Sequence, residues 1–127
     1  MDCEREIRLV HGSQGTVSHT VLAPCQWGFD ASLRSEMVHY DPVRARGLLD
    51  VCGYLDRNGY GWRERPDGSP LALEMTAQNA QRDRAINEGF DRDMRALGLR
   101  LKLHIGEFLE NSKATLAGKV MMQSLDC

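Results

Sequence analysis

The sequence has no long apolar run. No window approaches the roughly 18–20 consecutive apolar residues of a membrane-spanning helix, and the N-terminus lacks the basic, apolar and small-residue sections of a signal peptide. Charge of one sign is also missing, because 16 Lys and Arg residues are interleaved with 18 Asp and Glu residues, giving a net charge of −2. Charge alone therefore recruits neither nucleic acid nor an anionic membrane, and no nucleic-acid partner is predicted.

The motifs of the common enzyme and metal classes are absent from the sequence. The cysteines form no Cys-x-x-Cys pair, no serine lies in a Gly-x-Ser-x-Gly motif, and the histidines share no ligand spacing. The acidic residues Glu88, Asp91 and Asp93 lie among arginines, a pattern typical of surface ion pairs. We predict a protein that is not an enzyme and that needs no cofactor.

Regular helix and strand patterns are present. With 127 residues, 42% of them apolar, the chain is long enough for one domain with a modest core. Asp41 and Pro42 are typical of a helix start, and Gly53 is typical of a helix end. The predicted helices cover residues 4–10, 42–52, 80–97 and 107–117, and the predicted strands cover residues 71–76, 99–105 and 120–124. This order predicts an α/β fold with crossover helices and a parallel or mixed sheet.

Three of the helices have one apolar side, which predicts the side that faces the core. Between the first two helices, residues 16–33 show no sustained period and are predicted to form extended strand and loop. Cys52 is predicted to be a small buried apolar residue. The predicted core positions are Ala45, Leu48, Leu49 and Cys52, then Ile86, Phe90, Met94 and Leu97, then Phe108, Leu109, Ser112 and Leu116.

The linker after residue 53 is rich in turn signals. They are Asn58-Gly59, Tyr60-Gly61, Pro66-Asp67-Gly68 and Ser69-Pro70. Since glycine, proline and Asx residues each favour a defined turn geometry, the linker is predicted to be a structured connector.

The order of motifs around this linker is specific. It reads Asp-Pro, Ala, Leu-Leu-Asp, Gly-Tyr, Asp, Asn-Gly-x-Gly-Trp-Arg-Glu and Pro-Asp-Gly-x-Pro-Leu. This order resembles the family 5 extracellular solute-binding proteins, which are the oligopeptide, dipeptide and nickel-type receptors of ABC importers. The resemblance implies an internal fragment of one lobe of a two-lobe periplasmic binding protein. Residues 1–39 would form a segment with a short helix and an extended loop, and residues 40–127 the α/β portion of the same lobe.

The resemblance also implies a function. Family members hold a peptide or a similar small solute between two lobes, and closure of the lobes signals to a membrane permease. We therefore expect a solute and, in the full-length protein, an ABC permease as partners. The family is exported, so we expect a periplasmic or extracellular location, with membrane association through the transporter and a signal sequence outside this chain.

Five residues are predicted to contact the ligand. The resemblance places the stretch with Trp27 and Phe29 near the ligand cleft, where aromatic rings offer large rigid contact area. The alternative is that both rings pack in the core or within the lobe. In the family, a tryptophan after the last strand often contacts the ligand, and Cys127 stands at about that position. Gln123, Leu125 and Cys127 are therefore predicted to form the edge of the cleft.

A second hypothesis concerns the segment 56–67, which has the shape of a calcium loop. Its candidate ligands are Asp56, Asn58, Glu64 and Asp67. Tyr60 stands where an Asp or Asn would bind the ion, and Asp67 is shorter than the glutamate that normally closes such a loop. The alternatives are a stand-alone interaction module that responds to calcium and a turn that satisfies its own hydrogen bonds.

A lobe fragment without its neighbouring chain should leave apolar surface and a strand edge uncovered. We therefore expect self-association. We also expect weak or no peptide affinity, because part of a cleft does not enclose a ligand.

Overall fold

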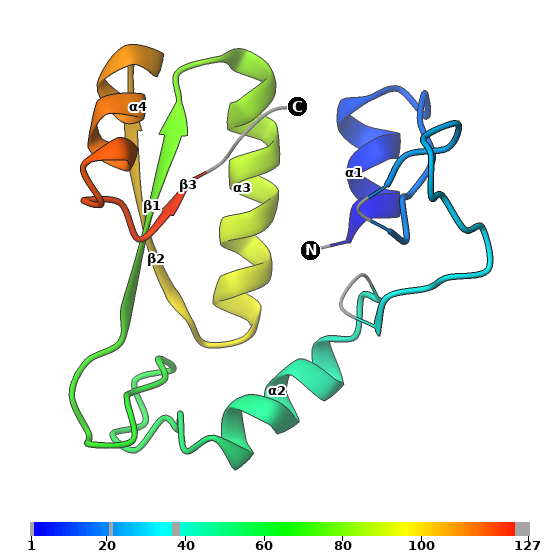
Figure 1. The fold of residues 1–127 in the computed structure, drawn as a ribbon. Coiled ribbons are helices and arrows are strands. Elements are labelled where there is room, and N and C mark those ends of the chain that lie inside the picture. Colours follow the sequence, from blue (N-terminus) through cyan, green and yellow to red (C-terminus); the bar gives the residue numbers. More distant parts are fainter. Residues whose placement is uncertain (1, 21, 37–38, 124–127) are drawn as a thin grey trace. The chain divides into compact units, whose positions relative to one another are not determined.

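The computed structural model describes residues 2–20, 22–36 and 39–123. The chain forms two compact units, residues 1–41 and residues 42–127, which we call the N-terminal unit and the C-terminal unit (Figure 1). No helix in the described part of the chain is long and apolar enough to cross a membrane.

The N-terminal unit contains one helix, α1 (Cys3–Val10). Its start is fixed by Asp2, whose side chain accepts a hydrogen bond of 3.0 Å from the Arg5 amide. The rest of the described unit consists of turns and loops, so the expected strand within residues 16–33 is wrong. Polar side chains explain the difference, because Ser18 and Asp30 bond to nearby backbone groups and so compete with strand pairing.

The C-terminal unit has an alternating order of strands and helices. It consists of α2 (Pro42–Val51), β1 (Ala72–Gln78), α3 (Gln81–Ala96), β2 (Arg100–Gly106), α4 (Phe108–Leu116) and β3 (Met122–Gln123). The sheet order is β2-β1-β3 and both pairings are parallel, with Met75 opposite Leu103 and Met122. The predicted α/β fold with a parallel sheet is confirmed. The expected last strand, 120–124, begins at Met122 rather than at Val120, and Ser124 lies outside the described residues.

The ends of α2 and α3 follow from glycine. Gly53 and Gly98 adopt φ values of +82° and +76°, which L side chains rarely adopt. After Gly53 the Tyr54 amide bonds to the Leu49 carbonyl, and after Gly98 the Leu99 amide bonds to the Met94 carbonyl. The predicted helix end at Gly53 is therefore confirmed.

The sheet carries a helix on each face. Figure 1 shows α3 on one side and α4 on the other, and the two helices pack against β1. Along β1 and β2 every second side chain points to the same face, which places Met75, Ala77 and Leu101 together, and all three are buried. The predicted α3 positions Ile86, Phe90, Met94 and Leu97 are each half-buried, as expected for the inner side of that helix.

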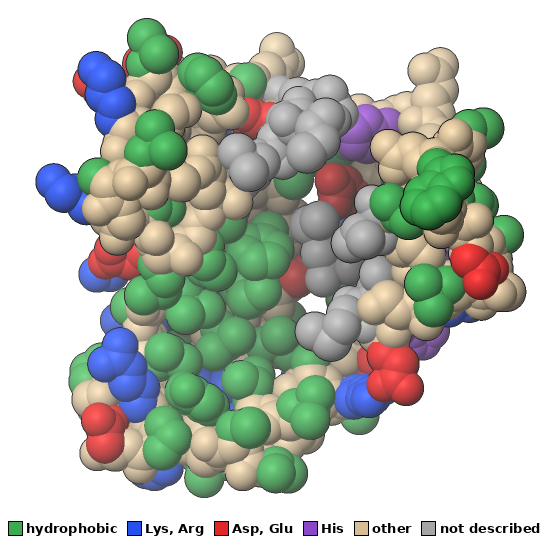
Figure 2. Space-filling view, in the orientation of Figure 1, with side chains coloured by type: hydrophobic (Ala, Val, Ile, Leu, Met, Phe, Trp, Pro, Cys, Tyr) green, Lys and Arg blue, Asp and Glu red, His purple; other side chains and the backbone are tan. Residues whose placement is uncertain are grey.

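The predicted inner sides of α2 and α4 are wrong in part. Leu48 is 58% exposed, and Cys52 is exposed rather than buried. Helix α2 has no buried residue, because among the described residues no element covers its apolar side. Apolar side chains accordingly lie open on the surface over α2 (Figure 2).

On α4 the predicted apolar side is also open, with Phe108, Leu109 and Leu116 exposed, the last at 90%. The buried residue of the helix is Asn111 instead. Its side-chain amide donates to the carbonyl oxygens of Ala77, at 3.0 Å, and Gly106, at 3.2 Å. These two bonds turn the polar side of α4 toward the ends of β1 and β2.

Gly106 leaves the room that Asn111 needs. A Cβ atom on Gly106 would lie 2.6 Å from the Asn111 Oδ1 atom, which is closer than atoms of real side chains approach. The hydroxyl oxygen of Thr115, one turn further along α4, lies 2.9 Å from the Asn111 carbonyl oxygen and 2.5 Å from Gln123 Oε1, and its single proton is donated to one of these two acceptors at a time. Asn111 and Thr115 therefore connect the carboxyl ends of β1 and β2 to β3.

This arrangement makes a stability prediction. Asn111→Ala should lower the free energy of unfolding by about 1–3 kcal/mol, because two buried carbonyl groups lose their donor. Asn111→Asp should be at least as damaging, since it places a carboxylate against two carbonyl oxygens. Urea unfolding of the whole chain, followed by circular dichroism, measures both. Glu110→Ala, an exposed position on the same helix, is the control; equal stability of the Asn111 and Glu110 variants would contradict the prediction.

Candidate functional site

Three of the five predicted ligand residues lie in the described part of the chain. Trp27 belongs to the N-terminal unit and is 99% exposed, so it does not pack in the core of that unit; the alternative that it packs elsewhere within the lobe stays a prediction. Phe29 is partly exposed and lines a pocket of about 180 Å³ in the same unit. Gln123 belongs to the C-terminal unit. Leu125 and Cys127 lie outside the described residues.

The Phe29 pocket has polar groups at its wall. Asp30 accepts hydrogen bonds from the Ser32 hydroxyl at 2.6 Å and the Ser32 amide at 2.8 Å, and these bonds lower the pKa of the Asp30 carboxyl. His19 lines the same pocket, and its Nε2 atom lies 3.2 Å from Arg34 Nη1. Since a guanidinium group has no acceptor, His19 Nε2 accepts this bond. The pocket therefore offers one aromatic face, one carboxylate and one imidazole.

Gln123 lies at the carboxyl end of the parallel sheet. The chain moves from β1 to β2 on one side and then to β3 on the other, so the strand order reverses at β1. Ligands of open α/β sheets bind outside the carboxyl ends of the strands at such a reversal. The predicted cleft residue Gln123 thus lies at this edge, next to the bonds made by Asn111 and Thr115.

In the predicted calcium loop, side-chain oxygen atoms accept hydrogen bonds from backbone amides of the same loop. The two carboxylate oxygens of Asp56 accept hydrogen bonds of 2.8 Å from the amides of Gly59 and Gly61. Asn58 accepts from the Tyr60 amide at 3.0 Å, and its side-chain amide donates to Glu64. The self-satisfied turn is therefore confirmed, and the calcium-responsive module is not favoured. The Asp67 carboxylate also accepts a hydrogen bond within the linker, from the Ser69 amide at 2.9 Å.

Arg63 fixes the linker to the rest of the C-terminal unit, a role that the sequence did not reveal. Its guanidinium donates to the Leu97 carbonyl at 2.6 Å, to the Tyr54 carbonyl at 2.5 Å and to Asp50 at 2.5 Å. Its backbone amide donates to the Gly98 carbonyl at 2.7 Å. Because these partners come from α2, from Tyr54 just after it and from the turn between α3 and β2, no local pattern could have identified them.

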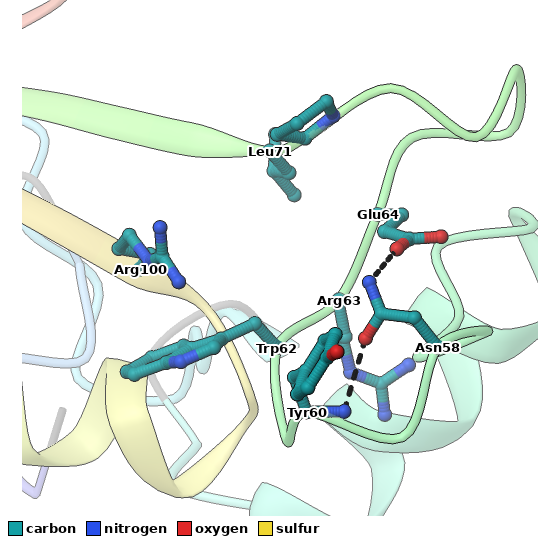
Figure 3. Close-up of a pocket in the computed structure, with 8 residues that line it drawn as sticks. Asn58, Tyr60, Trp62, Arg63, Glu64, Leu71 and Arg100 are labelled. Atoms are coloured by element: carbon teal, nitrogen blue, oxygen red, sulfur yellow. Dashed lines mark hydrogen bonds between the residues drawn. The ribbon is translucent and has the colours of Figure 1, made fainter.

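A second pocket, of about 190 Å³, opens beside this linker (Figure 3). The Arg100 guanidinium lies over the Trp62 ring, 5.0 Å from its centroid. Tyr60 and the bonded pair Asn58–Glu64 face the pocket from the linker, and Leu71 forms its opposite wall. The pocket lies at the amino ends of β1 and β2, since Leu71 precedes β1 and Arg100 begins β2. The sequence alone did not reveal this contact between Trp62 and Arg100.

A turn stabilised by Asp56 and a calcium site differ in whether calcium changes the stability of the protein. Asp56→Ala should lower stability by about 1 kcal/mol, because two backbone amides lose their acceptor, and this loss should be the same with and without calcium. Thermal unfolding with calcium from micromolar to millimolar concentrations measures both effects. Asp93→Ala, which removes a carboxylate outside the turn, is the control. A calcium-dependent rise in melting temperature that disappears in Asp56→Ala would overturn this assignment.

Comparison with known proteins identifies the fold. Neither a family model nor a curated protein matches the sequence. Among solved structures, the chain is similar to the oligopeptide-binding protein OppA, with 20% identity and a TM-score of 0.86 over 97% of this chain and 19% of that protein. It is also similar to NikA from Brucella suis in complex with Fe(III)-EDTA, with 24% identity and a TM-score of 0.83 over 97% of this chain and 24% of NikA.

A third similar structure is the oligopeptide-binding protein AppA from Bacillus subtilis in complex with a nonapeptide. Its identity to the chain is 19% and its TM-score is 0.80, over 89% of the chain and 22% of AppA. The chain therefore spans about a fifth of the length of the solved proteins that it matches. The resemblance predicted from the motifs around the linker is confirmed: the chain has the fold of one segment of the family 5 solute-binding proteins, which are two-lobe periplasmic binding proteins.

Proposed function

We propose that the chain is part of the substrate-binding protein of an ABC importer, which binds a peptide or a similar small solute for delivery to a membrane permease. The observation that carries the proposal is the structural match of 97% of the chain to OppA and to NikA, with TM-scores of 0.86 and 0.83. By this proposal the protein is periplasmic or extracellular, and it associates with the membrane through its transporter.

The solutes in the similar structures differ widely in chemistry. AppA was solved with a nonapeptide, NikA with Fe(III)-EDTA and the periplasmic binding protein MelB with stachyose. The same fold therefore serves several solute classes, and the proposal names a class of function rather than one solute. The similar proteins are binding proteins rather than enzymes, which supports a role without catalysis.

The proposed ligand edge is the carboxyl end of the sheet. Gln123 lies there on β3, and Leu125 and Cys127 follow it in the sequence. Trp27 and Phe29, which the resemblance places near the cleft, expose aromatic rings on the surface of the N-terminal unit. By this proposal the segments 1–39 and 40–127 belong to the same lobe.

Ligand binding by the product of the complete reading frame tests the function. Screening by thermal shift with di- to nonapeptides, metal chelates and oligosaccharides should identify a solute that binds with micromolar affinity in calorimetry. The 127-residue chain alone should bind it weakly or not at all, because it supplies only part of an enclosing surface.

Two glutamine variants test whether Gln123 contributes to solute binding in the same calorimetric measurement. Gln123→Ala in the complete product should weaken binding of that solute, whereas Gln81→Ala, an exposed glutamine at the start of α3, should not. Absence of binding across all three solute classes, together with a cytoplasmic location, would contradict the proposal.

Self-association of the chain is a separate prediction. Val51 and Leu116 are 87% and 90% exposed, and β2 and β3 are the edges of the sheet among the described residues. Open apolar side chains and strand edges favour association. Light scattering should show a molecular mass that rises with concentration, and Leu116→Glu should reduce the rise. Ala117→Glu adds the same charge without removing a large apolar side chain and is the control. A constant monomer mass would contradict this expectation.

A further inference from the structure

The pocket between Trp62 and Arg100 contains a cationic group, the Arg100 guanidinium, that can bind an anion. Among the residues that the structure describes, no carboxylate or carbonyl oxygen pairs with the Arg100 guanidinium, whose recorded contact is the Trp62 ring at 5.0 Å. A cation–π contact holds the guanidinium near the ring face and uses none of its N–H groups as hydrogen-bond donors to oxygen. Arg100 therefore lines the pocket with N–H groups that can donate to a ligand (Figure 3).

The other two charged side chains of the pocket, Arg63 and Glu64, already have hydrogen-bond partners within the protein. Arg63 donates to two backbone carbonyls and to Asp50. Glu64 accepts from the side-chain amide of Asn58. Arg100 is thus the group that can bind an anion here, and the geometry of a guanidinium matches that of a carboxylate.

The remaining walls define the rest of the ligand. Pro70 and Leu71 form an apolar wall, and the Trp62 and Tyr60 rings add aromatic surface. The volume of about 190 Å³ is smaller than the roughly 300–1,000 Å³ of sites for drug-sized ligands. A ligand of this size is comparable to one amino acid rather than to an oligopeptide.

We propose that this pocket is a binding site for a small monocarboxylate with an apolar group, such as an N-acylated amino acid. The carboxylate accepts hydrogen bonds from Arg100, and the apolar group packs against Leu71 and Pro70. Glu64 at the opposite wall repels a second carboxylate, so dicarboxylates are disfavoured. The site lies at the amino ends of β1 and β2, whereas the proposed ligand edge lies at their carboxyl ends. It therefore does not depend on the proposed function.

Tryptophan fluorescence gives a direct test, because the sequence has two tryptophans and Trp27 is fully exposed in the other unit. In a Trp27→Phe background, titration with N-acetyl-leucine should give a saturable change in Trp62 emission below about 10 mM. N-acetyl-leucine amide, which keeps the apolar group but lacks the negative charge, should give none. Glu64→Gln should let a dicarboxylate such as N-acetyl-glutamate bind more tightly.

Variants of Arg100 test whether its side chain is responsible for the binding of N-acetyl-leucine. Arg100→Gln should weaken binding about tenfold or more, because a charge-assisted bond is lost. Lys102→Gln removes the same charge two residues along β2, outside the pocket lining, and should leave binding unchanged. Arg100→Lys keeps the charge but not the fork and should bind with intermediate affinity, which remains informative if Arg100→Gln unfolds. A response to the amide, no saturation with the acid, or equal losses in Arg100→Gln and Lys102→Gln would overturn the proposal.

Discussion

The structure depends on hydrogen bonds that satisfy backbone carbonyls where strands and helices end. Buried apolar side chains in the described part of the chain are few, with Met75, Ala77, Leu99 and Leu101 as the core. A core of this size cannot by itself fix the ends of a parallel sheet. Asn111 holds the carboxyl ends of β1 and β2, and Arg63 holds the connection that enters the sheet at the opposite end. Both side chains donate to backbone carbonyls at the ends of these elements, and loss of a donor to a buried carbonyl is costly.

The fold could be predicted where its causes are local. Alternation along residues 99–105, the Asp41-Pro42 start and the Gly53 end depend on neighbours in sequence. The four predicted helices and the strands predicted at 71–76 and 99–105 lie where expected within a few residues. The inner side of α4 could not be predicted, because the partner of Asn111 lies 34 residues away on β1. An apolar stripe predicts burial only if something covers it, and for Leu48 and Leu116 nothing among the described residues does.

The candidate sites likewise could be predicted where their contacts are local in sequence and could not where the contacts join distant residues. The Asp56 turn could be predicted because all its hydrogen bonds join residues within the linker. The ligand role of Gln123 was predicted from the family resemblance and stays a prediction; the structure places this residue at the carboxyl edge of the sheet, where the strand order reverses. The Trp62–Arg100 pocket was missed, because a linker residue and the first residue of β2 meet only after the sheet has formed.

Among the described residues, β3 pairs with β1 through Met122 and Gln123, whereas β1 and β2 pair through seven residues. The described part of β3 has a second contact, because Gln123 lies against the Thr115 hydroxyl on α4. Asn111, one turn before Thr115, bonds to the carbonyls of Ala77 and Gly106. The contacts therefore run in series from β1 and β2 through α4 to Gln123, so a change that displaces α4 should also displace the side chain of Gln123.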